Sequence, residues 1–128
     1  MIILDRRVED ALTSGMIRQV IVADSDGFVL DHKGQVYDPD ELVSVFMSTQ
    51  RLMEEGATRL AFGQVIEFGF RLVGTDMAIA CRRVFSPEGG CLVIVIVPIG
   101  TAHNVIITDI VRRFAKYVEE QRASLRKS

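Results

Sequence analysis

Residues 20–30 read Val-Ile-Val-Ala-Asp-Ser-Asp-Gly-Phe-Val-Leu, which is an apolar run, a polar turn and a second apolar run. Aspartate and glycine supply the turn geometry of a β-hairpin, so strands are predicted at residues 17–23 and 28–33. The Asp-x-Asp-Gly pattern is also found at the start of calcium-binding loops. However, the twelfth position counted from Asp24 is Gln35, where an EF-hand needs glutamate. The sequence therefore predicts a hairpin turn here.

The clearest helix signal follows the hairpin, at residues 38–41 (Asp-Pro-Asp-Glu). Aspartate can accept hydrogen bonds from the first N–H groups of a helix, and proline suits the first helical position. Acidic residues also interact favourably with the positive end of the helix dipole. We therefore predict a helix that begins here and ends at Gly56, because glycine commonly follows the last helical residue. A shorter helix is predicted before the hairpin, at residues 2–12, with Gly15 as its end.

The second half of the chain is predicted to form three strands and a last helix. The strands are expected at residues 64–73, 76–85 and 91–97, with a glycine-rich turn at 86–90. Thr101 is expected to cap the helix that follows. The predicted order of elements is therefore α-β-β-α-β-β-β-α.

The predicted strand at 91–97 is apolar on both faces and the one at 17–22 is nearly so, which is typical of strands in the middle of a covered sheet. Hairpin connections then give the strand order 2-1-5-4-3. The predicted fold is an α/β (α+β) sandwich of two to three layers around a mixed-to-antiparallel five-stranded sheet. It forms a single domain over residues 1–128, with its core at about 2–120 and a frayed tail at 121–128.

The composition argues against several classes of function. The net charge is −2, and the 15 basic residues are spread among 17 acidic ones, so there is no basic stripe for nucleic acid. The first residues become charged after three apolar positions, unlike a secretory signal. The longest apolar run, residues 91–98, is far shorter than the ~20 residues that span a bilayer. We therefore expect a cytoplasmic protein that binds no nucleic acid and does not insert into a membrane.

Few residues could carry reaction chemistry. Cys81, Cys91, His32 and His103 could supply four zinc ligands, but no pair has the short spacing of a compact site. None of them stands in a recognisable nucleophile-and-base motif. The sequence therefore predicts no catalytic, metal or cofactor-binding residue, and a protein that is not an enzyme.

Two apolar features predict self-association. The strand at 64–73 is expected at a sheet edge, and an apolar edge is a liability unless another strand pairs with it. At ~100° per residue, one stripe of the long helix is expected to face the sheet: Leu42, Val45, Phe46, Thr49, Leu52 and Met53. Val43 and Met47 widen the apolar arc to roughly 220°, which predicts a second contact face. The predicted homodimer interface consists of Val43, Met47, Gln50, Glu54, Gln64, Ile66 and Phe68.

The hairpin motif at residues 24–30 and the order of the elements together resemble the roadblock/LC7 family, which has a profilin-like fold, over about residues 2–120. The resemblance implies a homodimer or heterodimer in which the second helices lie side by side and the third strands join into one sheet. It also implies a Ras-like small GTPase as partner, which such a domain activates or scaffolds. We therefore expect a non-catalytic homodimeric regulator that can stimulate GTP hydrolysis by its partner.

The candidate GTPase contact is a strip of the long helix: Ser44, Ser48, Arg51 and Glu55. Small residues four positions apart let another backbone approach closely, and a guanidinium donates to acidic groups. The same strip is also compatible with an ordinary solvated face. An alternative function is a small-molecule-sensing domain of the profilin or PAS type, which would require a pocket with convergent polar groups.

Overall fold

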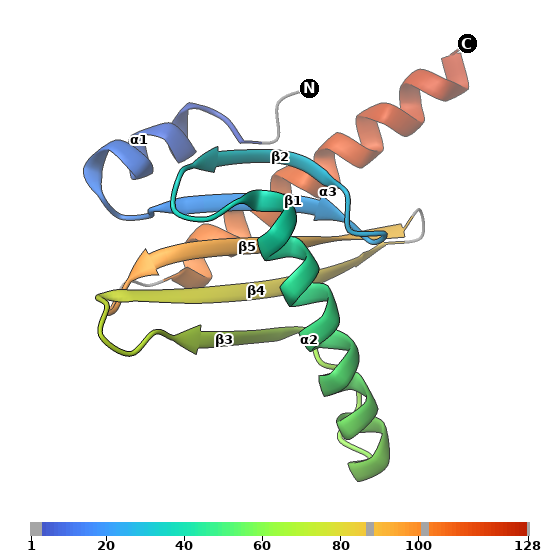
Figure 1. Cartoon of the computed structure of the whole chain (residues 1–128). Coiled ribbons are helices and arrows are strands. Elements are labelled where there is room, and N and C mark those ends of the chain that lie inside the picture. The colour runs from blue at the N-terminus through green and yellow to red at the C-terminus, as the bar shows by residue number, and fades with distance from the viewer. Residues whose placement is uncertain (1–3, 87–88, 101–102, 128) are drawn as a thin grey trace.

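The computed structural model describes residues 4–86, 89–100 and 103–127 (Figure 1). The elements are α1 (Arg6–Ser14), β1 (Gln19–Asp24), β2 (Val29–Gly34), α2 (Pro39–Leu60), β3 (Glu67–Arg71), β4 (Met77–Ser86), β5 (Gly89–Pro98) and α3 (His103–Lys127). The strands pair antiparallel in the order β2-β1-β5-β4-β3. The predicted α+β class and strand order are confirmed, and the pairing of the sheet is antiparallel throughout.

The sheet lies between two helical layers (Figure 1). α2 packs on one face, whereas α1 and α3 cover the other. Because successive side chains of a strand point to opposite faces, the central strands contribute to both layers. In β1, Val20 and Val22 pack with α1 and α3, and Ile21 packs with α2. This double burial explains why β1 and β5 are apolar at almost every position.

The turn between β1 and β2 is closed by the residues that predicted it. Asp24 Oδ1 accepts hydrogen bonds from the N–H groups of Asp26 and Phe28, at 3.0 and 2.9 Å. Gly27 has a φ of 93°, a backbone conformation that glycine adopts at little cost. The aspartate of this motif therefore shapes a hairpin turn, as predicted.

The first helix begins later than the sequence predicted. Asp5 accepts a hydrogen bond from the Arg7 N–H and caps the helix, so α1 starts at Arg6 instead of residue 2. Leu4 precedes the helix and is fully buried in the core. At the other end, Gly15 terminates the helix in the left-handed conformation, as expected.

α2 begins as predicted but ends one turn later. Asp38 accepts the N–H of Glu41 at 3.0 Å. Gly56, the predicted end, lies inside the helix, and the left-handed residue that terminates it is Ala61. Ala57, just beyond the glycine, is buried in the core, and a single glycine inside a helix costs only about 1 kcal/mol relative to alanine.

The second half differs from the prediction mainly at element ends. β3 covers Glu67–Arg71, which is shorter than residues 64–73, and β4 and β5 continue until Ser86 and Gly89 pair. α3 extends to Lys127, so the segment from residue 121 that was expected to fray is part of this helix. Thr101, the predicted cap of this helix, lies outside the described residues.

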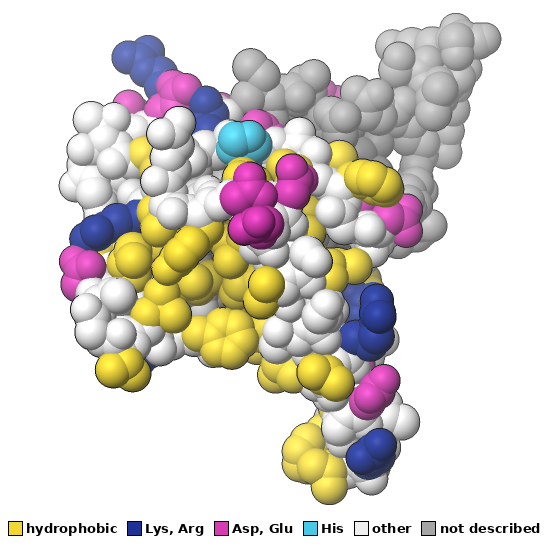
Figure 2. Space-filling model, in the orientation of Figure 1, with side chains coloured by type: hydrophobic (Ala, Val, Ile, Leu, Met, Phe, Trp, Pro, Cys, Tyr) yellow, Lys and Arg dark blue, Asp and Glu magenta, His cyan; other side chains and the backbone are white. Residues whose placement is uncertain are grey.

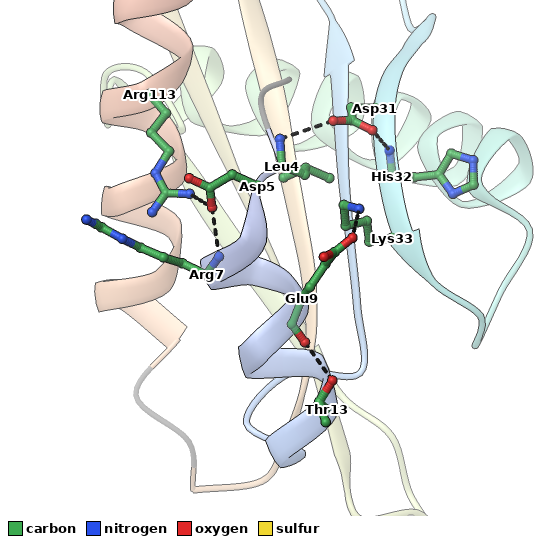
Figure 3. Close-up of polar contacts among 9 residues, drawn as sticks. All are labelled: Leu4, Asp5, Arg7, Glu9, Thr13, Asp31, His32, Lys33 and Arg113. Carbon is green, nitrogen blue, oxygen red and sulfur yellow. Dashed lines mark hydrogen bonds and ion pairs between the residues drawn. The ribbon is translucent and has the colours of Figure 1, made fainter. Parts of the chain in front are cut away.

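Polar contacts connect α1 to both of its neighbours (Figure 3). Asp31 on β2 accepts a hydrogen bond from the Leu4 N–H at 3.1 Å, and Lys33 pairs with Glu9 at 2.5 Å. On the other side, Arg113 of α3 pairs with the capping carboxylate of Asp5. These contacts fix α1 on the face of the sheet opposite α2.

In the described part of the chain, no helix is both long and apolar enough to cross a membrane.

Candidate interaction surface

The side of α2 that faces the sheet agrees only in part with the side that the sequence predicted. Val43, a predicted interface residue, is 1% exposed and belongs to the core, and Met47 packs beside it. Val45 and Leu52, which were expected to face the sheet, are 55% and 68% exposed. Leu42 and Phe46 of the predicted stripe do face the sheet, but Val43 and Met47 face it as well, and Val45 and Leu52 do not.

Aromatic packing explains this orientation of α2. Phe46 stacks on Phe68 of β3 with ring centroids 5.4 Å apart and meets Phe70 edge-on at 5.6 Å. Gly27 in the β1–β2 turn lies against the Val43 and Met47 side chains. Helical periodicity alone cannot distinguish two apolar stripes, because the choice depends on these contacts from distant strands.

Two further predicted interface residues make internal contacts. Glu54 pairs with Arg83 of β4, and the buried Gln50 amide lies beside the same guanidinium. With its oxygen turned toward β4, the Gln50 amide accepts hydrogen bonds from Arg83 Nη1 and Nε at 2.9 and 3.2 Å. The guanidinium also lies over the Phe85 ring, 4.6 Å from its centroid. Gln50 and Glu54 therefore attach α2 to its own sheet.

The candidate GTPase strip lies along one exposed side of α2. Its members are all exposed: Ser44, Ser48, Arg51 and Glu55. Next to it, Val45 and Leu52 point away from the sheet. The apolar pair and the polar strip together form one outward surface, and its apolar part was missed because those two residues were assigned to the core. The signal that could have found them was the over-wide apolar arc itself.

A second hydrophobic area lies beside α2, on the sheet face that the helix leaves uncovered (Figure 2). Figure 2 shows apolar side chains gathered over β3, β4 and β5 in this area. Figure 1 shows that the C-terminal end of α2 projects beyond β3, which is the open edge of the sheet. Large apolar residues are exposed on this end of α2, in the segment after it and on β3: Met53, Leu60, Phe62, Ile66 and Phe70.

The remaining predicted interface residues lie near this edge. Gln64 and Ile66 precede β3 and are exposed, whereas Phe68 is half-buried against Phe46. β3 therefore presents an open backbone edge, a partly exposed aromatic face and charged ends at Glu67 and Arg71.

The cysteines and histidines do not form a reaction centre in the described part of the chain. Cys81 and Cys91 face opposite sides of the sheet, and burial raises the pKa of each thiol to about 12. Such thiols are poor nucleophiles at neutral pH. His32 is exposed on the edge strand β2. Within residues 4–86, 89–100 and 103–127, no three His, Cys, Asp or Glu side chains are placed to hold a metal ion.

Comparison with solved structures identifies the architecture. MglB of Myxococcus xanthus superposes with a TM-score of 0.71, covering 92% of this chain and 93% of that one at 19% identity. An MglB with a tetrameric arrangement gives a TM-score of 0.63 at 18% identity, covering 82% of this chain and 77% of that one. The roadblock/LC7 domain from Streptomyces avermitilis gives 0.60 at 17% identity, covering 86% of each chain.

The chain has the roadblock/LC7 fold. Neither a protein-family model nor a curated protein matches the sequence. The resemblance seen in the hairpin and element order is therefore confirmed by structure where sequence comparison finds nothing. In this roadblock fold, α2 and the open edge of β3 lie next to each other, and both carry exposed apolar side chains.

Proposed function

We propose that this roadblock domain is a homodimeric, non-catalytic regulator or scaffold that binds a Ras-like small GTPase. The observation that carries the proposal is the apolar surface left on the outer side of α2 and along β3. Proteins that stay monomeric rarely expose many large apolar side chains around one helix and one sheet edge. Such patches commonly mark protein contacts.

The shape of one copy supports the proposed dimer. In the proposed dimer, a two-fold axis passes beside β3. The projecting C-terminal end of α2 in each copy then lies over the uncovered sheet area of the other copy. Leu60 and Phe62 then pack on that area, and full burial of such a side chain contributes about 1.5–3 kcal/mol. The same axis brings the two β3 edges together. Self-association is also described for the similar MglB with a tetrameric arrangement.

The GTPase contact is proposed on the outward surface of α2. Val45 and Leu52 supply an apolar centre, and the strip with Arg51 and Glu55 supplies a polar rim, which is the usual anatomy of a protein interface. Doubling by the two-fold axis gives one platform for one GTPase per dimer. The small GTPase as partner comes from the roadblock resemblance.

The proposed mode of action needs no catalytic group from this chain. A dimer that binds the GTP-bound conformation more tightly stabilises the partner's switch loops in that conformation. Stimulation of GTP hydrolysis would then arise from ordering the partner's own residues. We propose that the protein acts in the cytoplasm, together with its GTPase.

The test is a calorimetric titration with a Ras-like small GTPase from the same organism, loaded with a GTP analogue or GDP. We expect tighter binding of the GTP form, at two chains per GTPase. Leu52→Glu should weaken binding at least tenfold, the loss expected for a residue at the centre of an interface, and Arg51→Glu, which reverses a charge at the rim, should weaken it as well. Arg112→Glu reverses an exposed charge on the opposite face of the sheet and is the matched control.

Equal affinity for both nucleotide forms would contradict the proposed mode of action. If the α2 variants and the Arg112→Glu control bound alike, the contact surface would lie elsewhere on the molecule.

A further inference from the structure

The edge strand β3 has a self-complementary sequence. Residues Glu67–Arg71 read Glu-Phe-Gly-Phe-Arg, so the strand has the same pattern of side-chain sizes in both directions. Its two ends, however, carry opposite charges. An antiparallel copy of the strand therefore places aromatic opposite aromatic, glycine opposite glycine and carboxylate opposite guanidinium.

The backbone of β3 shows which groups face the open edge. The Ile66 carbonyl accepts a hydrogen bond from the Arg83 N–H at 2.7 Å, and the Leu72 N–H donates to Met77 at 3.3 Å. Backbone groups of alternate residues point to the same side of a strand. The even-numbered residues therefore pair with β4, whereas the N–H and C=O groups of Glu67, Gly69 and Arg71 face outward.

A two-fold axis restricts how this edge can pair with a second copy. Directly opposed residues of an antiparallel pair point to the same face of the sheet. Two identical strands satisfy this only if the two-fold axis passes beside one residue, which then lies opposite the same residue of the other copy. A register centred on Glu67 or Arg71 opposes like charges, which destabilises a strand pair. A register centred on Phe68 or Phe70 leaves one end of the strand unpaired and places a charged residue opposite Gly69.

The register centred on Gly69 pairs the whole strand. It places Glu67 opposite the partner's Arg71, and its outward backbone groups all find partners. Within its own chain, Glu67 already contacts Arg82 at 3.3 Å, whereas Arg71 lies opposite Ala78, which carries no charge. The carboxylate would thus stand between two guanidiniums. Gly69 itself cannot carry a side chain, because a Cβ there would approach the Ile79 carbonyl oxygen to 2.8 Å.

We propose that two copies of this chain pair through β3 in the register centred on Gly69, with reciprocal ion pairs between Glu67 and the partner's Arg71. This inference rests on the proposed homodimer and specifies its strand register and the charges that select an identical partner strand.

Cysteine cross-linking tests the register directly. The Glu67→Cys/Arg71→Cys double variant should form a disulfide-linked dimer under mild oxidation, since opposed residues have Cα atoms about 5.5 Å apart, within disulfide range. The two new thiols cannot bridge within one chain, where four residues of strand separate them by roughly 13 Å. Cys81 and Cys91 are 1% exposed with raised pKa values and should give little background.

Single variants identify the competing registers. A lone cysteine at position 67, 68, 70 or 71 opposes itself only if the register is centred there. We therefore expect Glu67→Cys, Phe68→Cys, Phe70→Cys and Arg71→Cys to give no linked dimer on a non-reducing gel. Linkage of any of these alone, or an unlinked double variant that light scattering shows to be dimeric, would overturn the register while leaving the dimer intact. A monomeric wild type would overturn both proposals.

Charge reversal provides a second readout. Arg71→Glu makes both ends of β3 acidic and Glu67→Arg makes both basic, so each homodimer should weaken about tenfold from two like-charge pairs. Mixing the two variants restores opposite charges at both positions, and a heterodimer tighter than either homodimer is expected. Equal affinities for all three combinations would contradict the ion pairs.

Discussion

At the scale of residues, Val43 and Leu60 lie on the same helix but have opposite roles. Val43 is buried beneath α2, whereas Leu60 is exposed on the end that projects beyond the sheet. A charge introduced at the first position has no partner in the core, and a charge at the second remains in water. A substitution at Val43 therefore tests folding, and a substitution at Leu60 tests association.

We expect Val43→Glu to abolish the folded state, because burying an unpaired carboxylate costs more than a small domain can lose. Leu60→Glu should keep the secondary structure and lose the dimer. Circular dichroism melting and light scattering of both variants measure this difference. A folded, monomeric Val43→Glu protein would show that the orientation of α2 described above is wrong.

A second prediction at this scale concerns Asp5. Burial raises the pKa of this carboxyl, but the Arg7 N–H and the Arg113 charge outweigh it, and the pKa lies below its usual 3.8. A lowered pKa contributes stability above the unfolded value that is lost as pH falls through the folded value. We expect Asp5→Asn to lower the urea midpoint at pH 7 and to have little effect at pH 2. Equal losses at both pH values would contradict the charge contribution.

At the scale of elements, local signals predicted what local contacts determine. The Asp24 turn, the Asp38 cap and the alternation of the strands are properties of neighbouring residues, so the order and pairing of the elements could be predicted. The orientation of α2 could not, because it depends on Phe46 meeting two phenylalanines of β3. Of the predicted interface residues on α2, Val43 and Gln50 are buried against their own sheet, whereas Met47 and Glu54 contact it and stay half-exposed, and the interface itself stays a prediction.

Gly56 gives a prediction for the α2 element. It lies inside the helix, and an added Cβ would meet no atom within 4 Å. Gly56→Ala should therefore stabilise the protein by about 0.5–1 kcal/mol, since alanine loses less conformational entropy in a helix. The change is best measured by urea unfolding in the Leu60→Glu background, where dimer formation does not contribute. A loss of stability there would mean that the helix ends at Gly56, as the sequence first suggested.

At the scale of the whole molecule, we propose that the chain acts by binding a second copy and a GTPase, and not by chemistry of its own. The described residues hold no metal-binding cluster, and both thiols are buried. We expect the purified chain to show no saturable binding of GTP in calorimetry and no phosphate release from GTP. A saturable isotherm with the chain alone would contradict the proposal that a separate GTPase carries the nucleotide.

The central claim is that the projecting C-terminal end of α2 and the edge of β3 are covered by a second copy of this chain. Light scattering coupled to size exclusion at tens of micromolar tests it most directly. We expect a mass of twice 14.3 kDa, or an even multiple of it, for the wild type, and one chain mass for Leu60→Glu. A wild-type protein that elutes at 14.3 kDa under these conditions would contradict the account.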